Sequence, residues 1–458
     1  MSRLTRTPRS AAAALAVAAA LAVAACAPPG SGTAPPPAQE SAPITAPVTP
    51  EQVAALGPVT LKILADAGEE DTLAKLVPAF QQRYPNVTVQ ADVRSYDDIV
   101  RTGVNTMAGD APPDLAQGAQ GYAVDGALVE AKLVRPIDDV AAVYGWEERF
   151  GSAALSELRW SDDGRSFGTG KLYSVSPVVS IVGVYYNRAT LQRLGLAVPT
   201  SPEEFEAALQ RAADAGVQPI VLGNSNRAPG LHAFGLVQGA QTPPQQVRDW
   251  ISGVDGATFA NPGTERAAAT IADWARRGWF GTGANGVAED DAVARFAGGE
   301  GLFLMGGTWV MPPLDEAQGQ EFGFFAMPPG RNGGVHAAPG SLGMGWHISS
   351  RTTVLPAAVA FLGMLHSPEF TQTLVDVSRV PVNPEGATAP TPLSTDALAA
   401  SARIVAEGGT MHSYDWATPT MMDAMGGAVQ GLLAGQVSPQ DVGRTVQADW
   451  EEYQAERR

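Results

Sequence analysis

The stretch YSVSPVVSIVGVYYNRATLQRLGLAVPTSPEEFEAAL, residues 173–209, contains a strand and two helices in one continuous run. Its first part, residues 173–187, is rich in Val, Ile and Tyr, which favour β-strands. The helix after it is expected to end near Gly195, because glycine readily takes the left-handed conformation that closes helices. A proline turn follows, and Ser201 is placed to cap a second helix over 202–215.

Strands and helices alternate in the same way on both sides of this stretch. Residues 59–64 (VTLKIL) alternate with the period of a strand, and residues 71–84 carry their apolar side chains at helical spacing. The other expected elements are a strand over 86–93, a helix over 96–108, a turn into a strand at 112–115 and a strand over 218–223. This alternation predicts an α/β fold. From Val59 the body has about 400 residues, more than a single core usually holds, so two lobes are expected.

The amino terminus has the pattern of a targeting signal. Three arginines without an acid precede residues 11–25, an uninterrupted run of Ala, Leu and Val that is too short to span a membrane. Cys26, the single cysteine of the 458 residues, follows directly. Residues 27–50 are mostly Ala, Pro, Gly, Ser and Thr, a composition that does not form a core. We therefore expect a signal peptide over 1–25 and a tether over 26–57.

The residues around Cys26, Val-Ala-Ala-Cys, resemble the bacterial lipobox, whose thiol is alkylated by a diacylglyceryl group and becomes the new amino terminus. Two acyl chains hold a protein on a membrane where one does not. The formal net charge is −17, and it becomes −20 once the three arginines of residues 1–25 are removed. Such a charge argues against binding to nucleic acid or to anionic lipid, since both need a basic face. The expected membrane contact is therefore covalent.

Several segments together resemble the extracytoplasmic solute-binding proteins of ABC importers, of the carbohydrate type (family 1) that includes the maltodextrin receptors. Besides the opening stretch, they are LVPAFQQRYPNVTV, GDAPPDLAQ, GEGLFLMGGTW, GSLGMGWHISSRT and AAVAFLGMLHSPEF. The resemblance implies a two-lobed type II periplasmic-binding-protein fold with a hinge. It implies a first lobe of residues 58–178 plus 346–390 and a second lobe of 182–340 plus 395–458. The chain would cross between them near 178–182, near 340–345 and towards Pro390.

A sugar site needs aromatic faces and polar groups for hydroxyls, and an open α/β sheet places its ligand at the ends of strands. Trp309 follows the strand-like GLFLM and a glycine pair, and the resemblance implies that it stacks on sugar. A core position is the alternative, because tryptophan is usually well buried. Asp415 and Trp416, in the loop-like MHSYDWATP, match an aromatic platform late in the family's chain. Trp346 lies near an expected crossing, where either a ligand contact or packing at the hinge would explain it.

Five polar side chains near expected strand ends complete the candidate ligand set: Glu69, Gln117, Gln120, Asn224 and His232. For the glutamate, a solvated acidic helix start is an equal alternative. For the histidine, a packing role is the commoner one.

Enzymatic motifs are weak in this sequence. The five histidines lack metal-ligand spacing, no G-x-S-x-G occurs, and the GTGANG of residues 281–286 follows a helical segment where a dinucleotide site needs a strand. We expect no metal, no cofactor and no catalytic residue. The predicted function is a monomeric, lipid-anchored receptor outside the cytoplasmic membrane, which delivers a sugar or oligosaccharide to a permease with its ATPase. A secreted glycoside hydrolase remains an alternative, because carboxylates are abundant. A receptor for another solute, such as a polyamine, an iron complex or a peptide, is a second one.

Overall fold

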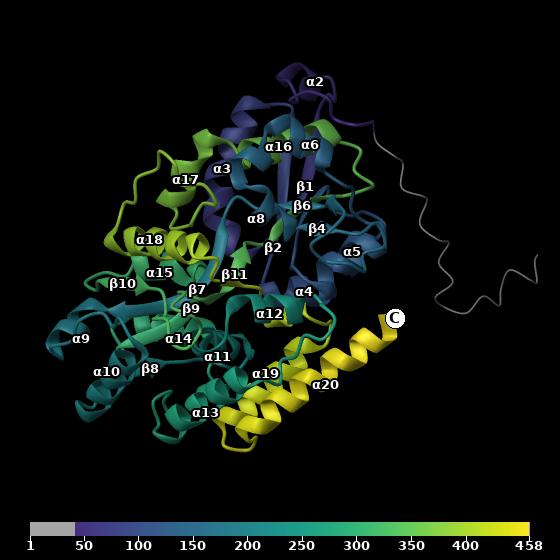
Figure 1. Ribbon diagram of the computed structural model, residues 1–458. Helices are drawn as coiled ribbons and strands as arrows, with labels where there is room; N and C mark the ends of the chain where they lie inside the picture. The colour runs from purple at the N-terminus through teal and green to yellow at the C-terminus, as the bar shows by residue number, and fades with distance from the viewer. Residues whose placement is uncertain (1–41, 458) are drawn as a thin grey trace, which may run out of the picture. The chain divides into compact units, whose positions relative to one another are not determined.

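The computed structural model describes residues 42–457, all within the unit that runs from Gln39 to Arg458 (Figure 1). The predicted signal peptide, Cys26 and the predicted tether up to residue 41 lie outside the described residues. No helix within 42–457 is long and apolar enough to cross a membrane.

Residues 44–54, which we expected to belong to the tether, are instead attached to the folded body. The Ile44 amide donates to Asp139 Oδ2 at 2.7 Å, and Thr49 caps the short helix α2 (Pro50–Ala54). Val53 of this helix is fully buried. The tether therefore ends earlier than predicted, because a few apolar side chains in a Pro-rich stretch are enough to pack on the body.

The first sheet has the strand order β2-β1-β3-β12-β6. Strands β1, β2 and β3 are parallel, while β12 is antiparallel to both β3 and β6. The strands are β1 (Val59–Asp66), β2 (Val87–Arg94), β3 (Leu115–Gly118), β6 (Ser174–Val175) and β12 (Gly345–Ile348). The main helices of this part are α3 (Glu70–Arg83), α4 (Tyr96–Ala108), α16 (Leu355–Leu365) and α17 (Thr371–Asp376). We call this sheet with its helices the first lobe.

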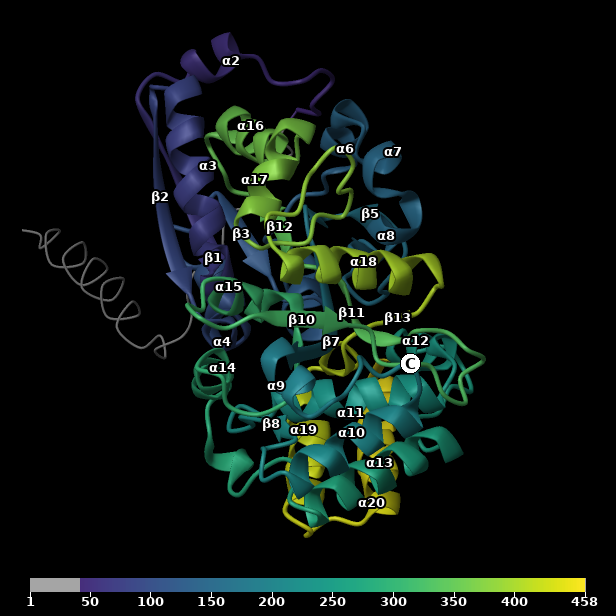
Figure 2. The same ribbon diagram turned by 90° about the vertical axis from the view of Figure 1, so that its left-hand side faces the viewer.

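The second sheet has the order β13-β11-β7-β9-β8, and β10 also pairs with β7. Its strands are β7 (Val179–Asn187), β8 (Ile220–Val221), β9 (Phe303–Gly307), β10 (Phe322–Phe325), β11 (Ala338–Leu342) and β13 (Thr410–Met411). Its larger helices are α10 (Pro202–Asp214), α11 (Ala228–Gln241), α13 (Pro262–Arg276), α14 (Glu289–Ala297), α18 (Pro392–Ala406), α19 (Met421–Leu433) and α20 (Pro439–Arg457). We call this sheet with its helices the second lobe. Figure 2 shows the first lobe in the upper part and the second below it.

Shorter elements connect these parts. The helices are α5 (Ala127–Glu130), α6 (Asp138–Tyr144), α7 (Trp146–Phe150), α8 (Ser152–Ser156), α9 (Arg188–Arg193), α12 (Pro244–Ile251) and α15 (Met311–Asp315). Single turns of helix are η1 (Ala67–Glu69), η2 (Tyr122–Gly126), η3 (Ala284–Gly286), η4 (Thr308–Val310), η5 (Pro368–Phe370) and η6 (Tyr414–Trp416). Strands β4 (Arg159–Trp160) and β5 (Lys171–Leu172) form a separate small ladder.

The periodic segments fold as the sequence predicts because their apolar faces meet a sheet. In α3, the buried side chains Leu73, Leu76 and Phe80 belong to the same core as Leu61 and Ile63 of β1. Helix α11 has no polar face and is buried along almost its whole length in the second lobe.

The chain passes between the sheets three times, at residues 176–178, 343–344 and 377–391. These segments are hydrogen-bonded to one another: the Val179 amide donates to the Val380 carbonyl at 2.9 Å, and the Gly343 amide to the Val178 carbonyl at 2.7 Å. Adjacent crossings of this kind form a hinge, because motion of the lobes is absorbed by a few residues. The residue limits of the lobes given by the sequence remain a proposal.

Candidate ligand-binding site

The two lobes touch where Gly121, after β3, faces Trp416 of η6. Gly121 has φ +92° and ψ −171°, a conformation that is essentially restricted to glycine. A Cβ atom at this position would lie 2.5 Å from the Trp416 Cα. Any side chain here would therefore collide with the backbone of the other lobe.

Beside this contact, a hydrogen bond joins the lobes. The Tyr96 hydroxyl, in the first turn of α4, donates to Asp415 Oδ2 at 3.1 Å. Burial raises the pKa of the Asp415 carboxyl. Burial, followed by the negative charge of Asp415, raises the pKa of Tyr96 well above its ordinary value. Tyr96 is therefore a hydroxyl donor at neutral pH, and it holds Asp415 in position.

Two aromatic rings, those of Phe167 and His412, pack edge to face against Trp416. Phe167, from the loop between β4 and β5, has its ring centroid 6.1 Å from Trp416 and 5.3 Å from His412. The His412 ring lies 5.4 Å from Trp416. Burial lowers the pKa of His412 to about 3, so that it is neutral. Such edge-to-face pairs fix the orientation of each ring, and they hold the Trp416 indole in one place.

Trp309 forms a second aromatic group in the second lobe. It lies in η4, directly after β9, and its ring centroid is 5.2 Å from that of His232 on α11. Burial lowers the pKa of His232 to about 4. The side chains of Trp309 and Asn226 hydrogen-bond to the carboxyl group of Glu289, whose pKa burial raises to about 7.

Glu69 connects the site to the hinge. Its Oε1 accepts from Arg379 Nη2 at 2.5 Å, and Arg379 belongs to the third crossing between the lobes. Both side chains are almost completely buried, at 4% and 10% exposed. Arg379 also donates to the Gly68 carbonyl at 3.1 Å, while Asp66 lies next to the pair.

Gln117 and Gln120 are occupied by hydrogen bonds to backbone. The Asp66 amide donates to Gln117 Oε1 at 2.8 Å. Gln120 Nε2 donates to the carbonyl oxygens of Leu342 and Gly343, at 2.8 and 2.6 Å. Gln117 Nε2 also donates to the Met344 carbonyl at 3.5 Å, so both amides hold the second crossing; the ligand contacts that we predicted for them stay a prediction.

Asn224 and Trp346, for which we expected ligand contacts, are both buried and bonded or packed within their own lobes. Asn224 is fully buried; it donates to Asn285 Oδ1 and accepts from the Gly230 amide, both at 2.8 Å. Trp346 is 1% exposed and lies in the core of the first lobe, 6.4 Å from the Phe361 ring. The packing alternative describes Trp346 better, because β12 is a central strand that is covered by α16.

Sequence reasoning did not identify several residues that the fold brings to this place: Asp66, Tyr96, Asp97, Gly121, Phe167, Glu289 and Arg379. Asp66 ends a strand and Tyr96 follows a helix cap, so both positions could have been recognised. The pairing of Tyr96 with Asp415 joins residues 319 apart, which no local pattern signals. Together with Glu69, His232, Trp309, Asp415 and Trp416, these residues form what we call the interlobe cluster.

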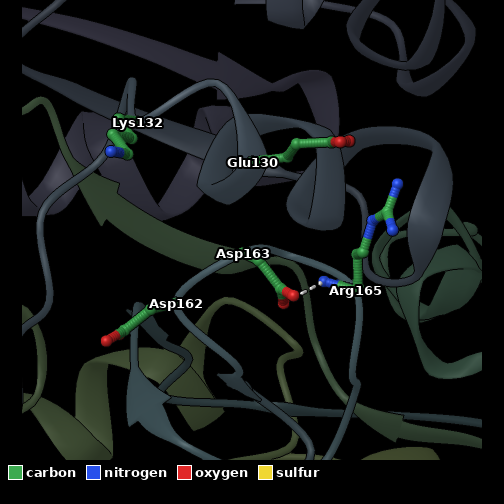
Figure 3. A pocket seen from close by; sticks show the side chains of 5 residues that line it. All are labelled: Glu130, Lys132, Asp162, Asp163 and Arg165. Atoms are coloured by element: carbon green, nitrogen blue, oxygen red, sulfur yellow. Dashed lines mark hydrogen bonds between the residues drawn. The ribbon is translucent and has the colours of Figure 1, made fainter.

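Two hollows in the described chain lie away from the interlobe cluster. One, of about 910 Å³, is on the first lobe between α6–α7 and α16. The other, of about 500 Å³, is lined by Glu130, Lys132, Asp162, Asp163 and Arg165 (Figure 3). Its lining is charged and has no aromatic face, which does not suit a sugar. Within residues 42–457, no group of three or more His, Cys, Asp or Glu side chains could hold a metal ion.

Comparison with known proteins identifies proteins that share the family and the fold of this chain. The family model of the bacterial extracellular solute-binding proteins matches residues 75–401. A multiple sugar-binding protein of Streptococcus mutans serotype c is 25% identical over 231 residues, 47% of this chain and 52% of its own length. The match thus spans about half of that curated relative.

Solved structures agree in fold over most of the chain. A chitin oligosaccharide binding protein is similar with a TM-score of 0.74 at 20% identity, over 86% of this chain and 99% of its own. The solute-binding protein RafE in complex with raffinose has a TM-score of 0.68 at 20% identity, over 86% and 99%. The two-lobed α/β fold and the family resemblance seen in the sequence are confirmed.

Proposed function

The chain belongs to the bacterial extracellular solute-binding proteins, and from this premise we propose that it is the sugar-binding component of an ABC importer. It captures a sugar or oligosaccharide outside the cytoplasmic membrane and delivers it to the permease. The observation that carries the proposal is the interlobe cluster, in which two tryptophans of the second lobe lie with carboxyl groups from both lobes. The names of its relatives, which include a multiple sugar-binding protein and a complex with raffinose, support the ligand class.

The cluster supplies the two kinds of contact that a sugar needs. Trp309 is half-buried and Trp416 is 6% exposed while the lobes touch, and their indole rings would stack on the C–H faces of pyranose rings once the lobes part. Asp415 and Glu69 present carboxyl oxygens, which accept hydrogen bonds from hydroxyl pairs. These groups come from different lobes, so they surround a ligand together only when the lobes approach.

The hinge couples capture to a change of shape. The three crossings limit the motion to opening and closing, and we take the arrangement in which Gly121 touches Trp416 to be the closed one. Ligand binding between the lobes favours closure, because the ligand adds contacts that only the closed form makes. The permease then distinguishes a loaded receptor by its closed form.

The proposal also includes the membrane partner. The permease subunits and their ATPase take the sugar, and a lipid on Cys26 keeps the monomeric receptor at the membrane. A site outside the cytoplasm follows from the family; the lipid anchor rests on the Val-Ala-Ala-Cys sequence alone.

The test is a panel of solutes added to the purified mature chain. Heat-denaturation midpoints are measured with mono- and oligosaccharides, peptides, polyamines and iron complexes, and each hit is followed by calorimetry. A saccharide should raise the midpoint by mass action, since it binds only the folded form. Stabilisation by a non-sugar alone would contradict the proposal. Release of reducing sugar from oligosaccharides would identify a glycoside hydrolase instead.

A further inference from the structure

The last turn of α20 extends beyond the second lobe and packs on the first. Up to Trp450 the helix belongs to the second lobe: Val446 is fully buried in its core, and the Trp450 indole donates to the Trp250 carbonyl at 2.8 Å. About one turn later, Tyr453 packs against a different core cluster, whose buried members lie between residues 64 and 173 of the first lobe. Helix α20, drawn in yellow in Figure 1, therefore reaches from one lobe to the other.

Aromatic and cationic side chains make this contact. The Tyr453 ring lies 5.4 Å from the Tyr122 ring of η2, centroid to centroid. The Arg457 guanidinium, one turn further along α20, lies 4.3 Å from the centroid of Tyr122 and 5.0 Å from that of Tyr453. Aromatic rings at such separations attract one another, and a guanidinium over a ring face is attracted by the ring's quadrupole. Because the same cation faces a ring of each lobe, part of this attraction exists only while the lobes touch.

A row of aromatic rings connects this contact to the candidate ligand site. The Tyr122 ring packs edge to face on Trp160 at 5.3 Å. Trp160 packs on Phe167, also at 5.3 Å, and Phe167 lies 6.1 Å from Trp416. The row thus begins in the second lobe at Tyr453 and returns to the second lobe at Trp416. Rings that pack on one another in this way cannot separate at one end of the row without a change at the other.

Helix α20 is also bonded to the loop that carries Trp416. The Asp449 carboxylate accepts hydrogen bonds from the hydroxyl groups of Thr418 and Thr420, at 2.6 and 2.7 Å. Thr418 follows Trp416 by two residues, and Asp449 precedes Tyr453 by about one turn of helix. The last turn of α20 and the loop of Trp416 are therefore parts of one rigid unit, and they approach the first lobe together.

We propose that residues 453–457 of α20 are a latch, which holds the lobes together by placing Tyr453 and Arg457 on Tyr122. The latch favours the closed arrangement with or without a ligand, because its contacts are made within the protein. A ligand that is enclosed only by the closed form binds more tightly as that form becomes more populated. The effect of the latch on affinity rests on the proposed function, whereas its effect on the lobes does not.

The first test measures the size of the empty protein by small-angle scattering of the mature chain. Tyr453→Ala and Arg457→Ala should each increase the radius of gyration, because the lobes separate more often when a latch contact is lost. Both side chains are half-buried in the last turn of a helix, so neither change empties a core. The melting temperature of each variant verifies that it is folded.

The second test is the sugar affinity, measured by calorimetry with the saccharide found in the panel. Tyr453→Ala should bind it about tenfold more weakly, and Arg457→Ala about fivefold, since the first loses a ring pair and the second a cation–π contact between the lobes. Tyr453→Phe keeps the ring and should resemble wild type more closely than Tyr453→Ala does.

The matched control is Arg444→Ala, which removes the same charge from the same helix. The Arg444 side chain is 74% exposed and pairs with Asp441, one turn earlier in α20. An exposed ion pair of this kind contributes little. Arg444→Ala should therefore change neither the radius of gyration nor the sugar affinity.

The possible results separate the latch from the proposed function. An unchanged radius of gyration in both Tyr453→Ala and Arg457→Ala refutes the latch. Weaker binding at an unchanged radius refutes it too, because the two residues would then act on the ligand site alone. A larger radius with unchanged affinity refutes the link between latch and capture. If no saccharide binds, the receptor proposal fails, and the radius of the empty chain still decides the latch.

Discussion

Replacement of Gly121 by alanine should impair capture without unfolding the protein. The added Cβ would lie 2.5 Å from the Cα and 2.6 Å from the Cβ of Trp416. Carbon atoms that are not bonded rest at about 3.5–4.0 Å, so the lobes would have to stand about 1 Å further apart. The obstacle is backbone, so a change of rotamer cannot relieve it.

The cost of that separation follows from the neighbouring contacts. A shift of about 1 Å would lengthen the 3.1 Å hydrogen bond from Tyr96 to Asp415 beyond bonding distance, a loss of about 1 kcal/mol. Dispersion contacts of Trp416 would lose about a quarter to a half of their strength. Together these losses raise the dissociation constant about tenfold or more. The Gly121 conformation adds a strain of about 1–3 kcal/mol, which lowers the stability of the folded chain whether the lobes are open or closed.

The assay is calorimetric titration of Gly121→Ala with the sugar found in the panel, together with its melting temperature. Gly333→Ala is the matched control, because Gly333 has φ +90° and nothing within 4 Å of the added Cβ. The control should lose some stability and keep its affinity. Unchanged sugar affinity in Gly121→Ala would refute the reasoning that the contact with Trp416 belongs to the ligand-bound form.

Three further outcomes are expected. Trp309→Ala should lower sugar affinity about 100-fold with little change in the melting temperature. Trp346→Ala removes a core side chain and should cost about 3–5 kcal/mol of stability. A large loss of stability in Trp309→Ala would mean that Trp309 is a core residue as well. Cys26→Ser should move the protein from the membrane fraction to the soluble one with its sugar affinity intact, and a variant that stayed on the membrane would contradict the lipid anchor. Burial raises the pKa of Glu157 to about 8, so its contribution to stability is complete below its ordinary pKa and is lost as the pH rises through about 8. The melting temperature should fall over that range in wild type and less steeply in Glu157→Gln; parallel profiles would contradict this.

The spacing of apolar residues in the sequence predicted the helices and strands well where an element has one buried face and one exposed face. The helix expected over 96–108 is α4 with the same bounds, and Ser201 caps α10 as predicted. The strand expected over 218–223 is reduced to β8, only Ile220–Val221, because it pairs with β9 alone at the edge of the sheet. The length of an edge strand depends on how far its one neighbouring strand runs beside it. The sequence of the edge strand does not contain that information.

The candidate site was predicted in part. Trp309, Asp415 and Trp416 follow strands or lie in loops, and the fold brings them to the interlobe cluster, although their contact with a ligand stays a prediction. The amides of Gln117 and Gln120 satisfied the same rule of position. A strand end tells where a side chain lies, but the partners that occupy Gln120 are 222 and 223 residues away.

The hydrogen-bond partners of Gln120 also show that the hinge and the candidate ligand site involve the same residues in this protein. Gln120 holds the second crossing through the Leu342 and Gly343 carbonyls, and Glu69 holds Arg379 of the third crossing. Both residues follow the ends of first-lobe strands, Glu69 in η1 after β1 and Gln120 after β3, where an α/β sheet binds its ligand. A ligand that draws on the Glu69 carboxylate therefore competes with Arg379 for its charge, and the crossing must respond. The proposed sugar site and the hinge thus share one set of hydrogen bonds, through which a bound ligand would change the balance between open and closed lobes.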